Sequence, residues 1–208
     1  MKRFTKIFSI FFMLSILGIF QSCGPTESAG IRDFEINEIR VRNLDNSNEY
    51  LSYNASNTMH KNAVAFEIDL YDSRMYGSQA SCTDFIINSC QAYSPIEPMY
   101  KPVHAIRKIS IVTLADFSPT LPANTDVSDT FLVLPEEPRT GDYLYRTLAD
   151  FYTLVHDKVS SYPQIRFSLV CQERIENTSA QFRITVEFDN DTNLVIETEN
   201  IELIDTNE

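Results

Sequence analysis

The 208-residue sequence contains no tryptophan, only five glycines, and far fewer basic than acidic residues. The five glycines are too scattered to form a P-loop or a dinucleotide-binding fingerprint, which argues against two large enzyme classes. The 17 Lys and Arg residues stand against 29 Asp and Glu residues, for a formal net charge of −12. A surface this acidic repels phosphate backbones, so we expect no nucleic-acid partner and no electrostatic attachment to anionic lipid.

The N-terminal segment has the parts of a secretory signal. Lys2, Arg3 and Lys6 form a basic start, and residues 7–20 are an almost unbroken apolar run. At 1.5 Å per residue this run makes a helix of about 21 Å, shorter than the roughly 30 Å hydrocarbon core of a bilayer. That length is typical of a signal-peptide core rather than of a permanent transmembrane helix.

The apolar run ends at a cysteine. Residues 20–23 (FQSC) resemble the lipobox of bacterial lipoproteins, in which the cysteine thiol is diacylated and becomes the new N-terminus. Ser22 and Cys23 fit that pattern, whereas the family prefers Leu and a small residue at the first two positions. An ordinary secretory signal with a chance cysteine is the alternative. The resemblance implies a signal peptide at 1–22 and a lipidated tether at 23–30.

The lipid would hold the mature protein on a membrane. Several acyl chains on one cysteine, at about 0.8 kcal/mol per buried methylene, give stable anchoring. Gly24 follows the cysteine, where an Asp is associated with retention in the inner membrane. The resemblance therefore implies an outer-membrane lipoprotein of a bacterial cell envelope, with the periplasmic and the surface-exposed leaflet both open.

From residue 31 onward the dominant hydrophobic period is two, which is typical of half-buried strands. Alternation over residues 64–70, 165–171 and 182–188 predicts three strands, and 109–111 predicts a further one. Near both ends of this region, at 34–41 and 194–203, the alternation of apolar and polar residues shifts its phase, which indicates bulges or breaks in the strands. Six or seven strands with one apolar face each predict a two-sheet β-sandwich, formed by a single domain over 31–208.

One segment follows a helical period instead. Its apolar residues fall on one stripe and predict a short amphipathic helix at about 143–159. Asp142 can cap the start of this helix, and Pro163 prevents its continuation. Two stretches, 44–61 and 72–103, lack the strand period, so we expect them to be long loops, which are functional or locally cross-linked when they occur in a compact domain.

A second resemblance lies in the middle of the chain. Residues 109–117 (ISIVTLADF), followed by 126–131 (DVSDTF), resemble a pattern in small lipoproteins of Bacteroidota. Those proteins pair a lipobox with an Ig-like β-sandwich domain of unknown function. Asn124 and Thr125 stand where that pattern favours Gly and Ser. The resemblance implies an Ig-like sandwich with one short helix in the cell envelope, and it implies no activity.

Three cysteines remain besides the lipidation site, in what we expect to be an oxidising compartment. Cys82 and Cys90 lie in the same polar loop, where a disulfide between them would contribute about 2–3 kcal/mol in the chain-entropy model. Cys171 occupies an inward position of a predicted strand, so we expect a buried, reduced thiol. A redox or nucleophilic cysteine is the alternative, without a Cys-x-x-Cys motif to support it.

The three histidines, His60, His104 and His156, show no spacing typical of a zinc site, so we expect no metal and no cofactor. A Ser/His/Asp triad assembles across a fold, so a hydrolase acting on envelope or imported polymers stays an alternative, although a Gly-x-Ser-x-Gly motif is missing. Residues 189–193 (DNDTN) resemble the start of a calcium loop, but Leu194 stands where an EF-hand needs Gly. We interpret this segment as a turn between strands, and weak calcium binding stays open.

Ten tyrosines are the remaining feature of the composition. A tyrosine offers a flat apolar face and a hydroxyl, which suit protein or glycan contacts, although the absence of Trp weakens the case for a carbohydrate platform. Tyr76, Tyr93 and Tyr100 are candidates for a binding face, with Tyr50 and Tyr53 in the other loop; anchoring of the loops is the alternative. We therefore expect a non-enzymatic module that binds a protein or glycan through loops, or a structural subunit of an outer-membrane complex.

Overall fold

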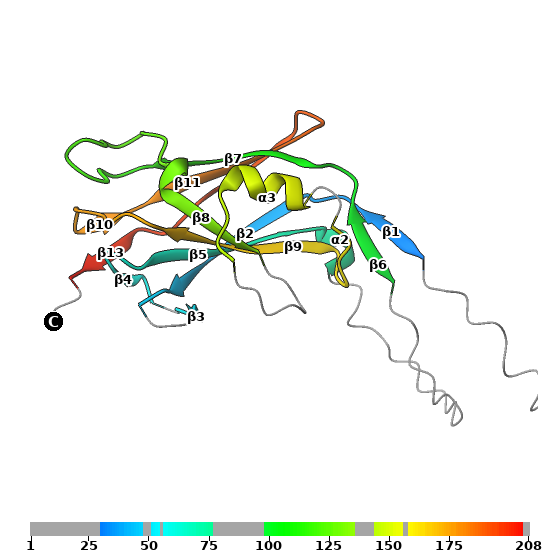
Figure 1. Ribbon diagram of the computed structural model, residues 1–208, viewed down its shortest axis with the longest axis horizontal. Coiled ribbons are helices and arrows are strands. Elements are labelled where there is room, and N and C mark those ends of the chain that lie inside the picture. Colours follow the sequence, from blue (N-terminus) through cyan, green and yellow to red (C-terminus); the bar gives the residue numbers. More distant parts are fainter. Residues whose placement is uncertain are drawn as a thin grey trace, which may run out of the picture.

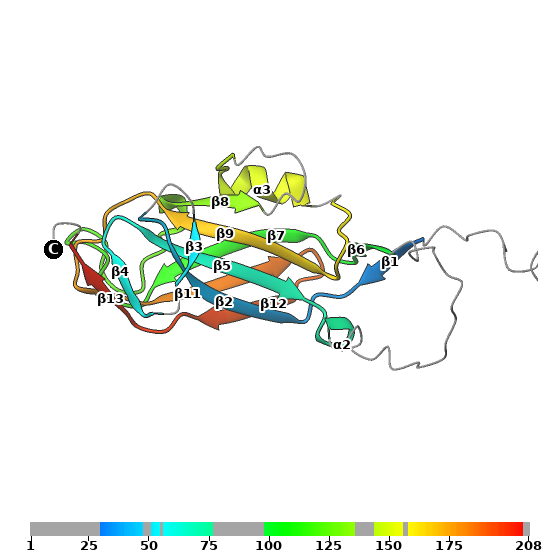
Figure 2. The same cartoon turned by 90° about the horizontal axis from the view of Figure 1, so that it is seen from below.

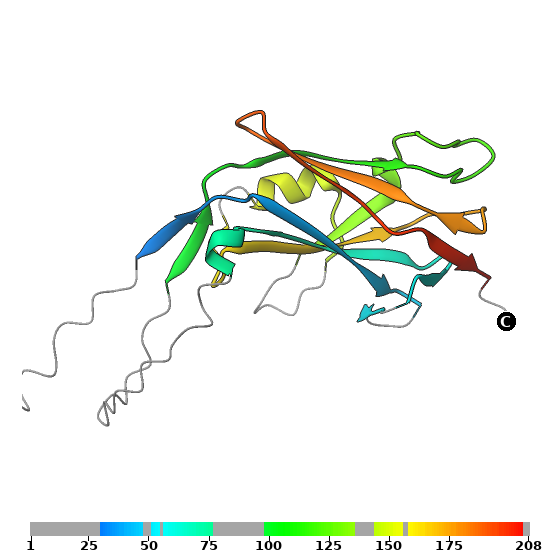
Figure 3. The same cartoon turned by 180° about the vertical axis from the view of Figure 1, so that it is seen from behind.

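The structure, a computed structural model, describes residues 30–47, 51–54, 56–76, 98–135, 144–155 and 158–205. Most of these residues lie in strands. The strands form two facing layers, with one longer helix beside them (Figures 1 and 3).

One layer is a five-stranded antiparallel sheet. In spatial order its strands are β3 (Ser52–Tyr53), β2 (Glu38–Asp45), β5 (Val64–Tyr71), β9 (Gln164–Cys171) and β8 (Phe131–Pro135). The other layer is a three-stranded antiparallel sheet. In spatial order its strands are β12 (Asn193–Glu197), β11 (Phe182–Phe188) and β7 (Ile106–Thr113). The alternating apolar residues of these strands fill the space between the layers.

The strand order identifies the topology. Without the short β3, the first sheet runs β2-β5-β9-β8 and the second runs β12-β11-β7. If these strands are lettered A to G in chain order, the sheets become A-B-E-D and G-F-C, which is the arrangement of an immunoglobulin constant-type domain. The predicted Ig-like β-sandwich is therefore confirmed, as are the predicted strands that correspond to β5, β7, β9 and β11.

Short strands extend the sandwich at both ends. At one end, β1 (Ile31–Phe34) and β6 (Met99–Pro102) pair in parallel and project from the sheets (Figures 1 and 2). At the other end, β13 (Ile201–Ile204) pairs with β10 (Ser179–Ala180) and, in parallel, with β4 (Thr58–His60). The chain therefore enters the domain at one end and finishes at the opposite end.

Aromatic side chains join the two sheets. Phe182 on β11 makes edge-to-face contacts with Phe66 on β5 and Phe131 on β8, with ring centroids 5.6 Å apart in both pairs. Phe117 adds a third contact to Phe182 at 6.5 Å, and all four rings are buried. Such pairs contribute about 0.5–1.5 kcal/mol beyond their area burial. This cluster links strands B and F, which antibody domains join through a disulfide packed on a tryptophan.

Charged pairs cover the outer face of the five-stranded sheet. On β5, Glu67 pairs with Arg42 of β2, and the carboxylate of Asp69 lies 3.3 Å from the guanidinium of Arg166 on β9. Asp69 is only 1% exposed. Cross-strand pairs of opposite charge stabilise neighbouring strands. They explain why β5, the middle strand of this sheet, is largely buried on both faces.

The predicted helix is present but is shorter than 143–159. Helix α3 covers Leu148–Val155. The hydroxyl oxygen of Thr147 accepts a hydrogen bond from the backbone N–H of Asp150 (3.2 Å), so Thr147 caps the start. The predicted cap, Asp142, lies outside the described residues.

Backbone pairing before the helix explains the difference. Arg146 exchanges two backbone hydrogen bonds of 2.8 Å with Val133 of β8, which holds this part of the chain extended. Leu144 therefore lies before the helix and is 57% exposed, although it continues the apolar period. Val159 likewise follows the end of the helix. The predicted start of the helix was wrong because hydrophobic periodicity does not show that residues just before the helix pair with β8.

The two predicted loops, 44–61 and 72–103, contain more regular structure than expected. Strands β3 and β4 lie in the first, and β6 lies in the second, after the one-turn helix α2 (Ser73–Tyr76). Each of these strands has only two to four residues, too few for an alternating pattern to stand out. The expectation of structureless loops was wrong in these parts.

The free edge of β7 is covered by local side chains and turns. The hydroxyl of Tyr152 on α3 accepts from Ile109 N (2.8 Å) and donates to Ile109 O (3.2 Å). Ser128 Oγ accepts from Ile111 N (2.8 Å), and the turn at 124–125 pairs with the end of the strand. Exposed strand edges promote aggregation, so these contacts protect the sheet. Both middle segments that resemble the lipoprotein pattern take part in this arrangement.

Candidate functional site

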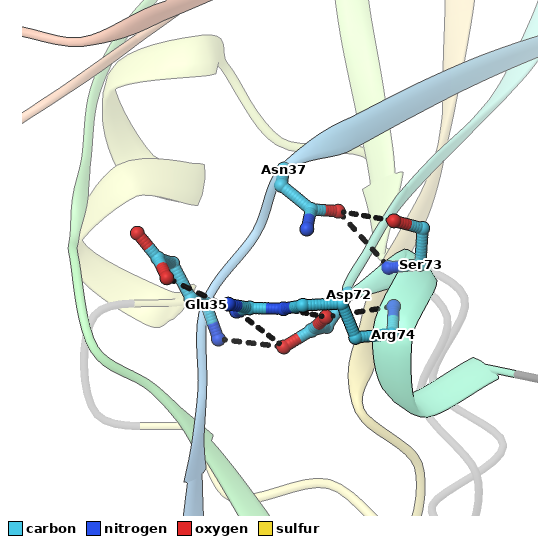
Figure 4. A network of polar contacts seen from close by, with 5 residues as sticks. All are labelled: Glu35, Asn37, Asp72, Ser73 and Arg74. Atoms are coloured by element: carbon cyan, nitrogen blue, oxygen red, sulfur yellow. Dashed lines mark hydrogen bonds and ion pairs between the residues drawn. The ribbon is translucent and has the colours of Figure 1, made fainter. Parts of the chain in front are cut away.

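A network of polar contacts closes the end of the sandwich near β1 and β6 (Figure 4). We call the side chains and backbone groups of Glu35, Asn37, Asp72, Ser73 and Arg74 the Asp72 network. Asp72 ends the turn between β5 and α2, and it is 3% exposed. Its Oδ1 accepts from the backbone N–H and Nε of Arg74 (both 3.0 Å), and its Oδ2 accepts from an Arg74 NH2 group (3.1 Å) and from Glu35 N (3.4 Å).

Every polar group at the centre of this network has a partner within the protein. Arg74 also pairs with Glu35 Oε2 (3.0 Å), and Asn37 Oδ1 accepts from the backbone N–H and the hydroxyl of Ser73 (2.9 and 3.0 Å). The hydrogen bonds from Arg74 hold the pKa of Asp72 below its ordinary value, against the opposing effect of burial. The network ties the β1–β2 connection to α2, and its central carboxylate has no open position for a ligand.

The opposite end of the sandwich holds a pocket of about 180 Å³, which we call the end pocket. It lies where the end of β2 meets β3, β4 and β13. Its lining residues are Leu44, Asp45, Asn54, Thr58, Met59, His60, Ala63 and Ile204. Drug-sized ligands occupy about 300–1,000 Å³. The end pocket is therefore suited to a single side chain or a small group rather than to a nucleotide or flavin.

Short-range backbone contacts shape this pocket. The parallel pairing of β4 with β13 sets His60 opposite Ile204, and the N–H of Lys61 donates to Ile204 O (3.0 Å). The carbonyl of His60 accepts from Ala63 N (2.9 Å), which closes the turn before β5. Asn54 Nδ2 donates to Thr58 O (3.1 Å) and holds β3 against β4. The pocket walls are thus fixed by the fold.

Two side chains give the end pocket its polarity. Asp45 Oδ1 accepts from the backbone N–H of Ser47 (2.8 Å). Hydrogen bonds from Ser47 are the main reason that the pKa of Asp45 is lowered, with a smaller electrostatic contribution from His60, so the carboxylate is ionised at neutral pH. Nδ1 of His60 is shielded from solvent and has no hydrogen-bond partner in the part of the chain that the structure describes.

The cations beside the pocket are already paired. Lys61 Nζ lies 3.3 Å from Asp205, which also pairs with Arg174, and Arg174 lies 3.9 Å from Glu176. By contrast, the described residues provide no ion pair between Asp45 and a Lys or Arg. Among the described residues, the end pocket therefore contains one carboxylate whose charge is not balanced by a neighbouring Lys or Arg.

An exposed aromatic ring lies next to the pocket. Tyr53 is 65% exposed and sits directly opposite Leu44 in the β2–β3 register. The guanidinium carbon of Arg42 lies 5.9 Å from its ring centroid, within the range of a cation–π contact. Among the described tyrosines considered for a binding face, Tyr53 is adjacent to the lining residues Leu44 and Asn54, although it is not itself part of the lining.

The other proposed tyrosines do not form an exposed face in the described residues. Tyr100 lies on β6 and is 7% exposed, and it exchanges two backbone hydrogen bonds with Ser160 (2.7 and 2.8 Å). The assignment of Tyr100 to an exposed binding loop was therefore wrong, because this segment pairs with β1 and packs inward. Tyr76 ends α2, but its side chain lies outside the described part, as does the whole of Tyr93.

The cysteines fall into two groups. Cys171 is a free thiol, 3% exposed, whose Sγ donates to Glu173 O (3.2 Å), so the predicted buried and reduced cysteine is confirmed. Burial raises the pKa of its thiol to about 11, which makes it unreactive at neutral pH. Cys82 and Cys90, with their predicted disulfide, lie outside the described residues, as does the predicted lipidation site Cys23.

The predicted turn at 189–193 is present between β11 and β12, and Asn193 already belongs to β12. Asp191 has a φ of 62°, which Asp tolerates better than most residues. His104 Nδ1 lies 3.1 Å from Asp189 Oδ1, and Arg107 donates to Asp191 Oδ1 (2.7 Å). Among the described residues no group of three His, Cys, Asp or Glu side chains could hold a metal ion. His156, the third histidine, lies outside them.

Comparison with known proteins does not assign a function. No protein-family model matches this chain, and no curated protein matches it either. In the described part of the chain, no helix is long and apolar enough to cross a bilayer. The end pocket is therefore the candidate functional site of the described residues.

Proposed function

We propose that this protein is a lipid-anchored component of a bacterial outer membrane that acts by binding a protein or a glycan. The support for the anchor is the short apolar run of residues 7–20 that ends at Ser22 and Cys23. The support for binding rather than catalysis is a small pocket with one carboxylate, close in the sequence to an exposed tyrosine. The acidic surface of the chain argues against nucleic acid as the ligand.

The position of the end pocket is the observation that supports this proposal best. Seven residues lie between Cys23 and Ile31 at the start of β1, and the eight Cα–Cα steps span at most about 29 Å. The described chain enters the domain at β1, whereas the strands β4 and β13, which line the pocket, lie at the other end (Figures 1 and 2). A protein held by Cys23 thus presents its pocket away from the membrane, where a partner can reach it.

The anchor is tested by fractionation of cells that express the wild type or Cys23→Ala. We expect the wild type in the membrane fraction, and the variant either released or retained as an uncleaved precursor. A Cys23→Ala protein that is cleaved and anchored normally would contradict the lipid anchor.

Binding is tested by pull-down and glycan-array experiments with wild type, Tyr53→Ala and Asp129→Asn. Tyr53 lies beside the pocket, whereas Asp129 is exposed outside it and serves as the control. We expect capture of a partner by the wild type and the control, with reduced capture by Tyr53→Ala at unchanged melting temperature. Turnover of an envelope polymer that is lost in His104→Ala would instead support the alternative of a hydrolase, because His104 pairs with Asp189.

A further inference from the structure

The end pocket combines features that select one kind of chemical group. We infer that it binds a primary ammonium group on a short aliphatic stem, as carried by a lysine side chain of a protein partner. This inference rests on the proposed binding function and specifies its chemistry. The pocket lining supplies one carboxylate, one imidazole, two neutral polar side chains and four apolar side chains. The carboxylate, the imidazole and the apolar side chains favour such a ligand over the alternatives.

Charge provides the first reason. Asp45 is the only Asp, Glu, Lys or Arg among the lining residues, and the neighbouring Lys61 and Arg174 are held by Asp205. An ammonium group donates charge-assisted hydrogen bonds, which are about twice as strong as neutral ones. An anion would meet the unbalanced carboxylate at close range, and a neutral hydroxyl would gain less. The net charge of −12 also favours the approach of a cation.

The imidazole of His60 provides the second reason. Its Nδ1 is shielded from solvent and has no hydrogen-bond partner among the described residues, and a buried polar atom left unpaired is unfavourable. A neutral imidazole protonated at Nε2 offers Nδ1 as an acceptor. His60 is one of the lining residues, so its imidazole borders the same space as Asp45. An ammonium group has three N–H donors, enough for both Asp45 and His60.

Shape provides the third reason. Leu44, Met59, Ala63 and Ile204 line the pocket with aliphatic surface. Burial of a methylene contributes about 0.8 kcal/mol, so a four-carbon stem gains affinity that a bare ammonium ion lacks. A volume of about 180 Å³ accepts such a stem and excludes larger ligands. The exposed ring of Tyr53 lies beside the pocket, where it can contact the peptide backbone that carries the lysine.

The inference is tested by ligand-observed NMR titration of the purified full chain in detergent. The probes are n-butylammonium, Nα-acetyl-lysine N-methylamide, 1-butanol and butyrate. We expect binding of the two ammonium compounds in the millimolar range, with at least tenfold weaker binding of butanol and butyrate, as judged from the strength of a charged hydrogen bond (about 1.5–3 kcal/mol). The lysine compound should bind at least as tightly as butylammonium, whereas the reverse order would indicate a free amine as the natural ligand.

Matched variants locate the binding. Asp45→Asn should weaken butylammonium binding about 10- to 100-fold, and His60→Ala about 2- to 10-fold, as expected for a charged and a neutral hydrogen bond. Asp129→Asn removes an exposed carboxylate outside the pocket and should leave the affinity unchanged. Equal binding of butanol and butylammonium, or equal affinity of Asp45→Asn and wild type, would overturn the inference. In either case, partner capture that still depends on Tyr53 would leave the proposed binding function standing with a different ligand.

Discussion

The two ends of the sandwich each contain an aspartate with a lowered pKa, but the surroundings of the two carboxylates differ. In the Asp72 network, both oxygens of Asp72 accept hydrogen bonds from Arg74, and one also accepts from Glu35 N. In the end pocket, Asp45 accepts only from Ser47 among the described residues, and Nδ1 of the nearby His60 has no partner. The carboxylate of Asp72 has all its acceptor positions occupied by hydrogen bonds from the protein. The carboxylate of Asp45 does not.

This difference separates a structural role from a binding role. A buried polar group that is fully paired stabilises one arrangement of the backbone, and it has no capacity left for a ligand. A polar group left without a partner carries an energetic cost that a ligand can remove. We therefore expect substitutions in the Asp72 network to change stability, and substitutions in the end pocket to change binding. The predictions below test this separation, in order of decreasing effect.

Disruption of the buried aromatic cluster between the two sheets should cause the largest loss of stability. Phe182→Ala removes a buried ring that contacts Phe66, Phe117 and Phe131, and we expect the free energy of unfolding to fall by about 3–5 kcal/mol. Denaturant unfolding followed by circular dichroism measures this loss. A loss below about 1 kcal/mol would mean that the two sheets are held together elsewhere, and that the ends are not supported by a common core.

Neutralising the two aspartates should have unequal effects on stability. Asp72→Asn replaces an acceptor-only group by an amide whose NH2 faces the donors of Arg74, so we expect a loss of about 1–3 kcal/mol. Asp45→Asn keeps an oxygen for Ser47 N and should change stability by less than about 0.5 kcal/mol. Chemical denaturation of both variants at pH 7 gives the comparison. Equal losses of unfolding free energy in the two variants would contradict the different roles of Asp72 and Asp45.

Acid should weaken the Asp72 network. Because the folded-state pKa of Asp72 lies below its ordinary value of 3.8, the ionised form stabilises the protein above that pH, and the stabilisation is lost as the pH falls through the folded pKa. The difference in unfolding free energy between wild type and Asp72→Asn should therefore narrow below about pH 3.8. Urea unfolding at several pH values from 7 to 2.5 measures this difference. A difference in unfolding free energy that does not change with pH would show that the charge of Asp72 does not stabilise the protein.

A moderate loss of stability is expected at a hydrogen-bonded contact on the edge of β7. Tyr152→Phe removes the hydroxyl that bonds both backbone groups of Ile109, and we expect a loss of about 1 kcal/mol, since water can reach part of this edge. The melting temperature of the variant measures it, with Tyr145→Phe as an exposed control. A larger loss for the control would contradict the importance of the Ile109 contact.

The sequence predicted the sandwich because its longer strands repeat their pattern several times. β5, β9 and β11 each place at least three apolar residues at alternate positions, which is enough to define a buried face. β6 and β8 carry the same alternation over only two or three inward residues, one of them a proline, so they could not be recognised. The bounds of α3 depended on the backbone pairing of Arg146, which no local pattern reveals.

The end pocket was not predictable for a related reason. Asp45 ends β2, Asn54 directly follows β3 and His60 ends β4, and Ile204 reaches them from the last strand of the chain. Their spacing matches no motif, and His60 looked isolated because its surroundings are created by the parallel β4–β13 pairing. The loop tyrosines attracted attention through composition, which does not distinguish the buried Tyr100 from the exposed Tyr53.

The separation of the two ends can be tested in one measurement: the melting temperature of wild type, Asp45→Asn and Asp72→Asn in butylammonium chloride and in sodium chloride of equal ionic strength. A ligand that binds only the folded state adds about 1.4 kcal/mol of stability when its concentration is ten times the Kd. We predict that butylammonium raises the melting temperature of wild type and of Asp72→Asn by similar amounts, and that Asp45→Asn gains much less. The same gain in all three proteins would contradict the assignment of binding to the end pocket.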